Sequence, residues 1–211
     1  MSKLLIQYRV LGSIGTNVYF LLNQETNQVI LVDPADDADY IVDQCQQRNY
    51  EPAAILLTHG HFDHIYAVND LRKAWPDVKV YAYEGEKKLM GDPWMNRSKV
   101  WAEPVSVQAD VWVKDHEILE LAGFSIEVIH TPGHTSGGCC YYIADEKTLI
   151  SGDTLFHESY GRTDLDTGSE SAIFRSIQEI LLKLPDDVNV YPGHMDMTTI
   201  EHEKKYNPAV F

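Results

Sequence analysis

One short segment of this chain limits its fold and its chemistry more than any other. The apolar run Ala53–Leu57 is typical of a strand buried on both faces, and it leads directly into His59-x-His61-x-Asp63-His64. Residues i and i+2 of an extended segment point the same way, so His59 and His61 are placed to bind one ion together. Asp63 and His64 fall where the chain turns into a helix, and we expect them to face a second ion nearby.

Three further polar positions, each directly after a glycine, repeat the pattern of a candidate ligand behind a strand. They are His134, Asp153 and His194, behind predicted strands at Phe124–Ile129, Thr148–Ile150 and Val188–Tyr191. Glycine permits the close backbone approach and sharp turn that a ligand-bearing loop needs. Taken alone, each position suits a capped turn better than a ligand. Beside the first motif, the set favours metal ligands, and imidazole nitrogen with carboxylate oxygen suits zinc, iron and manganese.

The order of predicted elements favours a layered α/β fold. In the first half we predict strands at Leu4–Val10, Asn17–Leu22, Gln28–Val32, Ala53–Leu57 and Val78–Ala82, and helices at Asp36–Arg48 and Ile65–Trp75. Asp36 is the expected cap of the first helix, and Pro76 stops the second. A second half starts near Trp112. It has a further strand at Cys140–Ile143, an amphipathic helix at Ser169–Leu184 whose apolar stripe includes Ile180, and a C-terminal helix near Thr199–Tyr206.

The segment Met90–Val105 lacks a regular pattern. It contains two prolines, Pro93 and Pro104, and two tryptophans, Trp94 and Trp101. We interpret it as a surface loop anchored by the tryptophans. Because loops beside sites also carry binding residues, its role is left open.

The net charge and the cysteines indicate which partners the protein can bind and in which cell compartment it is found. The formal net charge is −15, and a negative field of this size repels nucleic acid and anionic membrane surfaces. The three cysteines are an odd number and include the adjacent pair Cys139 and Cys140, which is no disulfide framework and fits a reducing compartment. The segment after Met1 has no hydrophobic region long enough for a signal peptide, and no apolar run is long enough to span a bilayer. We therefore expect a cytoplasmic protein.

Taken in order, the motif at 59–64 and the three later positions resemble the metal signature of the metallo-β-lactamase superfamily. The resemblance covers nearly the whole chain. It implies a single domain over residues 1–211, folded as a four-layer αββα sandwich with the active site at one edge of the two sheets. It also implies the ligand set: a first metal held by His59, His61 and His134, a second held by Asp63, His64 and His194, and Asp153 bridging both.

Two segments, Gly152–Phe156 and Gly161–Asp164, resemble the short glyoxalase II-like hydrolases, or hydroxyacylglutathione hydrolases. This resemblance implies cleavage of a thioester such as S-D-lactoylglutathione by a hydroxide that bridges two divalent ions, zinc first and iron or manganese as alternatives. Asp63 would orient the hydroxide and accept a proton as well as bind metal. Full-length glyoxalase II carries an additional helical region for glutathione that this sequence does not contain, so the acyl group and the thiol carrier are left open.

Residues outside the ligand set are assigned supporting roles, each with an alternative. Asp33 is expected either to orient a ligand imidazole or to serve as a turn residue before Pro34. Arg162 is expected either to anchor a substrate carboxylate or to form a salt bridge with Asp164. We also expect Tyr160 and His157 to line the substrate pocket, because they lie between Asp153 and Arg162 in the sequence.

Two other activities remain open for the same site. The first is a persulfide dioxygenase, whose branch resembles this chain in Gly161–Asp164 and holds a single iron with residues matching His59, His134 and Asp153. The second is a lactonase or another ester hydrolase. A non-catalytic metal-binding module is disfavoured, because a structural site needs only four closed ligands. The sequence does not predict the oligomeric state.

Overall fold

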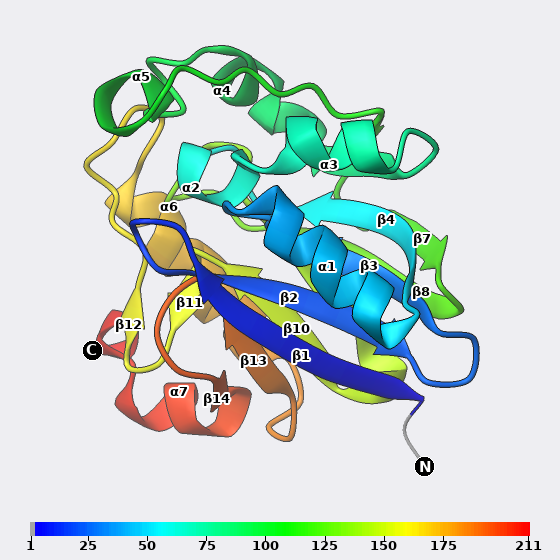
Figure 1. Ribbon diagram of the computed structural model, residues 1–211. Helices are drawn as coiled ribbons and strands as arrows, with labels where there is room; N and C mark the ends of the chain where they lie inside the picture. Colours follow the sequence, from blue (N-terminus) through cyan, green and yellow to red (C-terminus); the bar gives the residue numbers. More distant parts are fainter. Residues whose placement is uncertain (1–2) are drawn as a thin grey trace.

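The computed structural model describes residues 3–211 and contains two six-stranded sheets packed face to face (Figure 1). The N-terminal prediction and the predicted domain over residues 1–211 both include Met1 and Ser2, which lie outside the described residues. Within 3–211, none of the helices is both long enough and apolar enough to cross a membrane.

The first sheet has the order β1-β2-β3-β4-β5-β6. Its strands are β1 (Leu4–Leu11), β2 (Thr16–Asn23), β3 (Gln28–Val32), β4 (Glu51–Leu57), β5 (Lys79–Tyr83) and β6 (Val111–Val113). The second sheet has the order β14-β13-β10-β9-β8-β7. Its strands are β7 (Ile118–Leu121), β8 (Phe124–His130), β9 (Cys139–Ile143), β10 (Thr148–Gly152), β13 (Asn189–Pro192) and β14 (Thr198–Thr199), and the hairpin β11 (Leu155–Phe156) and β12 (Ser159–Tyr160) stands apart.

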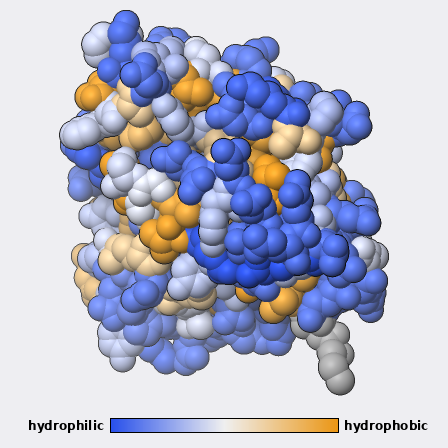
Figure 2. All heavy atoms as spheres, in the orientation of Figure 1, coloured by the Kyte–Doolittle hydropathy of each residue, from blue (hydrophilic) through white to orange (hydrophobic). Residues whose placement is uncertain are grey.

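Alternation along β2 shows how the first two layers form. Val18 and Phe20 pack in one cluster with Ile41 of α1 (Ala38–Arg48) and Leu71 of α3 (Val68–Ala74). The residues between them point to the opposite face, where Tyr19 packs against the second sheet. The outer side of α1 is covered by hydrophilic residues (Figure 2). The first sheet is therefore buried on both faces, by helices on one side and by a sheet on the other.

The second sheet repeats this arrangement in reverse. Ile126 and Tyr141 face the first sheet. Cys140 and Leu149 face outwards and pack with Ile173 of α6 (Glu170–Arg175) and with α7 (Ile200–Tyr206). The layer order is helix, sheet, sheet, helix, so the predicted αββα sandwich is confirmed.

Two predicted helices are divided in the structure. Ile65–Trp75 consists of α2 (Phe62–Ile65) and α3, because the amide of Ala67 donates to Pro34 O across the molecule at 3.1 Å. Ser169–Leu184 begins as predicted, with Ser169 as the cap of α6. It then continues as a wider π turn and a 3₁₀ turn. This change of pitch takes Ile180 off the buried stripe to an exposed position, so its predicted core role was wrong.

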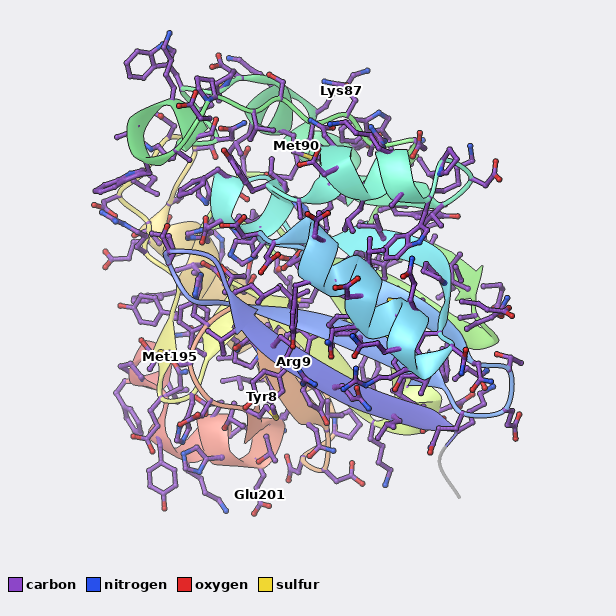
Figure 3. The ribbon with its side chains drawn as sticks, in the orientation of Figure 1. Tyr8, Arg9, Lys87, Met90, Met195 and Glu201 are labelled. Carbon is purple, nitrogen blue, oxygen red and sulfur yellow. The ribbon has the colours of Figure 1, made fainter. Side chains whose placement is uncertain are left out.

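Three further expectations were wrong in detail. Asp37, not Asp36, caps α1 and accepts a hydrogen bond from the amide of Tyr40. Trp112 does not open the second half, because β6 pairs in parallel with β5 and closes the first sheet. Trp94 and Trp101 do not anchor the 90–105 segment, since they are 58% and 68% exposed. This segment contains the end of α4 (Lys87–Gly91) and α5 (Ser98–Trp101). In Figure 3, Met90 of α4 points toward the body of the protein and Lys87 away from it.

The strand directions place the polar loops together. β3 and β4 are parallel, and so are β10 and β13. β8 runs in the same direction as β10, because both are antiparallel to β9. The carboxyl ends of these strands lead to Asp33, His59, His134, Asp153 and His194, at the edge of the sandwich where α2 and β11 lie (Figure 1). Backbone hydrogen bonds from Asn17 N to Gly193 O and from Cys139 N to Thr58 O join the two halves there.

Candidate metal centre

Six side chains form two compact groups of donor atoms at this edge. The atoms within each group lie within 4.8 Å of one another. One group is His59, His61 and His134, and the other is Asp63, His64 and His194. Each group combines residues from the 59–64 motif with one from the second half of the chain. The structure therefore brings together the residues that the sequence predicted as two ligand sets.

Asp153 lies between the two groups. Its Oδ2 is 3.5 Å from His134 Nε2 and 3.5 Å from His194 Nε2. Its Oδ1 is 3.5 Å from His64 Nε2. One carboxylate is thus shared by imidazoles of both sets, which is the position of a bridging ligand.

Several buried polar atoms of this centre lack the partners that such atoms normally have. Among the described residues, no hydrogen-bond partner reaches His59 Nε2, His61 Nε2 or Asp153 Oδ1. His61 Nδ1 and His134 Nε2 face one another at 2.8 Å. Converging lone pairs of nitrogen and oxygen fit divalent cations such as zinc, iron or manganese.

The outward nitrogen of most of these imidazoles is held by a fixed partner, which leaves the other nitrogen facing the centre. His64 Nδ1 lies 2.9 Å from Asp33 Oδ2, and the same carboxylate accepts hydrogen bonds from the amide and hydroxyl of Thr58. His134 Nδ1 donates to Arg162 O at 2.7 Å, and His194 Nδ1 lies 3.3 Å from Gly15 O. Asp33 thus contacts the imidazole of His64, as the orienting role predicted, and its backbone at φ 49° also makes the turn before Pro34.

The electrostatics of the two groups differ. Burial lowers the pKa of His59 and of His61, which favours the neutral imidazole that binds metal. Burial alone would also lower the pKa of His64. The carboxylates of Asp153, Asp63 and Asp33 have a larger effect than burial, and together they raise the pKa of His64 to about 10. Carboxylates arranged in this way attract positive charge, whether as a proton or as a cation.

Glycine before a ligand is required at all three predicted positions. Gly133 has φ 146°, and a Cβ there would lie 2.3 Å from the backbone of Ile173. Gly152 has φ 49°, and a Cβ there would lie 2.4 Å from the hydroxyl oxygen of Thr58. A Cβ on Gly193 would lie 2.2 Å from Asp153 Oδ1 and 2.8 Å from His64 Cε1. These contacts are far shorter than van der Waals distance, so a larger residue would displace the ligands.

The centre lies at the base of a cleft of about 750 Å³. Its base contains His61, Asp63, His134, Asp153 and His194, and its walls include Arg97, Trp101 and Arg162. Several wall residues are apolar and exposed, namely Ile14, Val100 and Trp101. The cleft gives a small organic molecule access to the metal-binding edge.

Comparison with known proteins agrees with this geometry. Residues 11–194 match the family described as the metallo-beta-lactamase superfamily. This chain belongs to that superfamily. Members bind divalent metals, and the donor groups above fit such a site. The superfamily membership and the site together support a metal-dependent hydrolase.

Two curated relatives within this superfamily cover most of the chain. The probable metallo-hydrolase YqgX of Bacillus subtilis (strain 168) is 37% identical over 199 residues, with 93% of each chain covered. The hydroxyacylglutathione hydrolase GloC of Haemophilus influenzae is 32% identical over 196 residues, with 91% of each chain covered.

Solved structures show the same metallo-β-lactamase fold. The B3 metallo-beta-lactamase BLEG-1 superposes with a TM-score of 0.92 at 36% identity, covering 98% of this chain and 99% of that one. TTHA1623, solved in a di-iron-bound form, gives a TM-score of 0.85 at 33% identity, covering 96% and 98%. ETHE1 from Myxococcus xanthus gives 0.79 at 26% identity, covering 97% and 83%.

Of the three residues that we predicted to bind substrate, one lines the metal cleft and two do not. Arg162 lines the cleft, but its guanidinium pairs with both carboxylate oxygens of Asp164 at 2.7 Å, as the salt-bridge alternative predicted. Tyr160 packs edge-on against Phe174 behind β12, and His157 lies beside His202. Neither is among the residues that line the metal cleft. Adjacency in sequence was misleading here, because the hairpin β11–β12 turns these two side chains away.

Glu86 is a residue of the site that the sequence interpretation missed. It is buried, and its two oxygens accept hydrogen bonds from Gly60 N at 2.7 Å and Gly137 N at 2.9 Å. Gly60 stands between His59 and His61, and Gly137 lies shortly after His134. Glu86 therefore joins the two loops that carry the first donor group. No sequence signal identifies it, because its partners lie 26 and 51 residues away.

Proposed function

We propose that this protein is a two-metal hydrolase that cleaves thioesters, with S-D-lactoylglutathione as the substrate to test first. The observation that carries the proposal is the pair of donor groups joined by Asp153. His59, His61 and His134 would hold one divalent ion, and Asp63, His64 and His194 the other. Zinc is the first candidate, and the di-iron form of TTHA1623 keeps iron open.

Bound cations would supply a Lewis acid and a water molecule whose pKa is lowered toward about 7. The chain's own residues fix the geometry. Asp33 holds the ring of His64, and the carbonyl of Arg162 holds that of His134. Asp63 lines the cleft, and Thr16 Oγ1 donates to it at 3.3 Å. This position supports the proposal that its carboxylate would orient a water molecule and accept a proton.

The thioester assignment is supported by the relative GloC, a hydroxyacylglutathione hydrolase that matches 91% of the chain. The exposed apolar wall of the cleft suits a small organic molecule. We infer a cytoplasmic location as well. In the described chain Cys45, Cys139 and Cys140 are free and buried, as expected in a reducing compartment.

The principal rival is a persulfide dioxygenase with a single iron held by His59, His134 and Asp153. The structural similarity to ETHE1 is consistent with this activity. A one-iron site leaves Asp63 and His194 without a metal to bind, although both face the centre. The second donor group therefore favours the hydrolase. A lactonase would use the same two-metal site and differ in substrate.

The test combines metal analysis with a hydrolysis assay on the purified protein. We expect about two divalent ions per chain, turnover of S-D-lactoylglutathione, and loss of turnover after chelation, with recovery on adding zinc. Asp153→Ala and His61→Ala should each lower kcat/KM by at least about 10²-fold, since each disrupts the metal site. His116→Ala, which changes an exposed histidine outside the centre, should leave kcat/KM unchanged.

Full turnover by a metal-free sample would overturn the proposal. One iron per chain with oxygen uptake on glutathione persulfide would favour the dioxygenase. Hydrolysis of lactones without hydrolysis of any thioester would identify the second rival.

A further inference from the structure

We propose that Arg97 is the anion-binding residue of the cleft, and that the natural substrate is a thioester carrying a carboxylate that this guanidinium receives. The inference rests on the proposed function, since it specifies the substrate class of the same site. It comes from the 90–105 segment, to which the sequence interpretation assigned no role.

The guanidinium of Arg97 is largely unpaired within residues 3–211. Its side chain is 27% exposed and lines the cleft with His61 and Asp63. Its Nε is buried without a hydrogen-bond partner. Its one ion pair is with Asp166, an exposed carboxylate, at 3.7 Å. An arginine has five N–H donors in a planar fork, and the single long contact with Asp166 leaves donors of this fork available to a ligand.

Arg162 differs in this respect, although it lines the same cleft. Its Nε and Nη2 each donate to Asp164 at 2.7 Å, which occupies one edge of the fork with an internal carboxylate. A ligand carboxylate that approached Arg162 would compete with that pairing. Of the two cleft arginines, Arg97 has the less satisfied guanidinium.

The backbone around Arg97 is fixed in position. Its φ is 72°, a left-handed conformation that is unfavourable for a residue with a Cβ. The neighbouring Asn96 is fully buried and fixes this turn, because its amide donates to Val105 O and Met90 O and accepts from Ser98 N. Asn96 O in turn accepts from Phe62 N, between His61 and Asp63. The strained residue is thereby tied directly to the metal-binding loop.

Charge and shape select the class of ligand. The protein carries a formal net charge of −15, so an anionic substrate approaching the cleft needs a local cation to offset the repulsion. Arg97 supplies that cation beside the centre. The exposed side chains of Ile14, Val100 and Trp101 provide an apolar wall for the uncharged part of the molecule. Around α5, Figure 2 shows hydrophobic residues among hydrophilic ones.

The test measures binding, so it does not require turnover. Isothermal titration calorimetry of the metal-loaded protein uses two pairs of stable thioethers. S-hexylglutathione and its diethyl ester probe a carboxylate on the thiol side. S-(3-carboxypropyl)-N-acetylcysteamine and S-butyl-N-acetylcysteamine probe one on the acyl side.

Arg97→Ala should weaken binding of the carboxylate member of at least one pair by about 10-fold to 100-fold, the range of a charge-assisted hydrogen bond. Binding of the member without a carboxylate should not weaken. Arg97→Lys should show an intermediate loss, because it keeps the charge without the fork. The matched control is Lys99→Ala, which removes an exposed cation of α5 that lies over Trp94, away from the cleft lining. It should bind all four ligands like the wild type.

Equal binding of both carboxylates by the wild type and Arg97→Ala would overturn the proposal. Equal losses for the members without a carboxylate would also overturn it, because they would show a structural effect. The pair that responds identifies the side of the substrate that carries the carboxylate. If the wild type hydrolyses no thioester but Arg97 still governs carboxylate binding, the proposed function fails and the anion site stands.

Discussion

Glu86 is a buried acidic residue whose two acceptor oxygens serve two separate loops. The amides of Gly60 and Gly137 both donate hydrogen bonds to its carboxylate. Burial raises the pKa of its carboxyl, because keeping a charge there costs free energy, while the side chain of Thr135 and the two amide donors act to lower it. Its role is to hold His61 and His134 on facing loops.

Glu86→Ala should lower both stability and metal affinity. Two buried N–H groups would lose their acceptor, at about 1–3 kcal/mol each, so we expect a loss of about 2–5 kcal/mol in urea unfolding. Metal titration should show weaker binding. The matched control is Glu203→Ala, since Glu203 is equally buried and accepts from Thr198 Oγ1 and Asn207 Nδ2 away from the metal cleft. It should lose stability but keep metal affinity, and an equal loss of metal affinity in both variants would contradict the role of Glu86.

The three thiols should be inert in the folded protein. Burial raises the pKa of Cys45 and Cys140 from 9.0 to about 12, and it raises that of Cys139 as well. A raised folded pKa means that the folded state holds the proton more tightly than the unfolded state. The resulting stability is fully present below pH 9 and is lost as pH rises through about 12.

Two measurements test the raised pKa of these thiols and the resulting loss of stability at high pH. A thiol-specific disulfide reagent should label the native protein negligibly at pH 8 and label all three cysteines after unfolding. The urea midpoint should fall between pH 9 and 11, and Cys45→Ala should reduce that slope. Rapid labelling of the native protein would contradict the burial argument.

At the scale of elements, the 90–105 segment is held by polar contacts, not by aromatic packing. Its tryptophans are exposed, and Asn96 provides the internal anchor through bonds to Met90 O, Val105 O and Ser98 N. An amide fits this position because it donates and accepts at once. The segment forms one wall of the cleft without a hydrophobic core of its own.

Asn96→Ala should loosen this wall. Removing three buried hydrogen bonds should cost about 2–4 kcal/mol of local stability, seen as faster amide exchange across residues 90–105. Because Arg97 is held by the same turn, kcat/KM should fall as well. Ser106→Ala removes one exposed hydrogen bond to Gly91 O and should change neither measurement. Unchanged exchange in Asn96→Ala would show that other contacts order the segment.

At the scale of the whole molecule, the proposed cations would link the two halves of the chain. The first sheet supplies the 59–64 ligands, and the second supplies His134, Asp153 and His194. Three large apolar clusters already hold the four layers together. We therefore expect a folded metal-free protein that gains further stability on binding metal.

Chelation should lower the melting temperature by roughly 5–10 °C. Free metal at 100 times Kd stabilises the folded state by about 2.7 kcal/mol, and each kcal/mol shifts a chain of this size by about 2–4 °C. Asp153→Ala should remove most of the shift, because it lacks the carboxylate between the two donor groups. Differential scanning fluorimetry with and without chelator checks this, and identical melting curves for the wild type would contradict a metal link between the halves.

The sequence by itself determined the features that depend on local spacing. The 59–64 motif, the glycine-preceded ligands and the order of the strands and helices are short-range patterns. They predicted a layered α/β fold and the residues that the structure gathers at one edge, and the family resemblance carried by the motifs implied the αββα sandwich. Tertiary structure decided the features that depend on distant partners. Glu86, Asn96 and Arg97 act through contacts with loops far along the chain, and Tyr160 and His157 turn away from the cleft although they stand near Asp153 in sequence. The spacing of residues in the sequence determines the local direction of a side chain. The residues that this side chain contacts are determined only when the two sheets pack together.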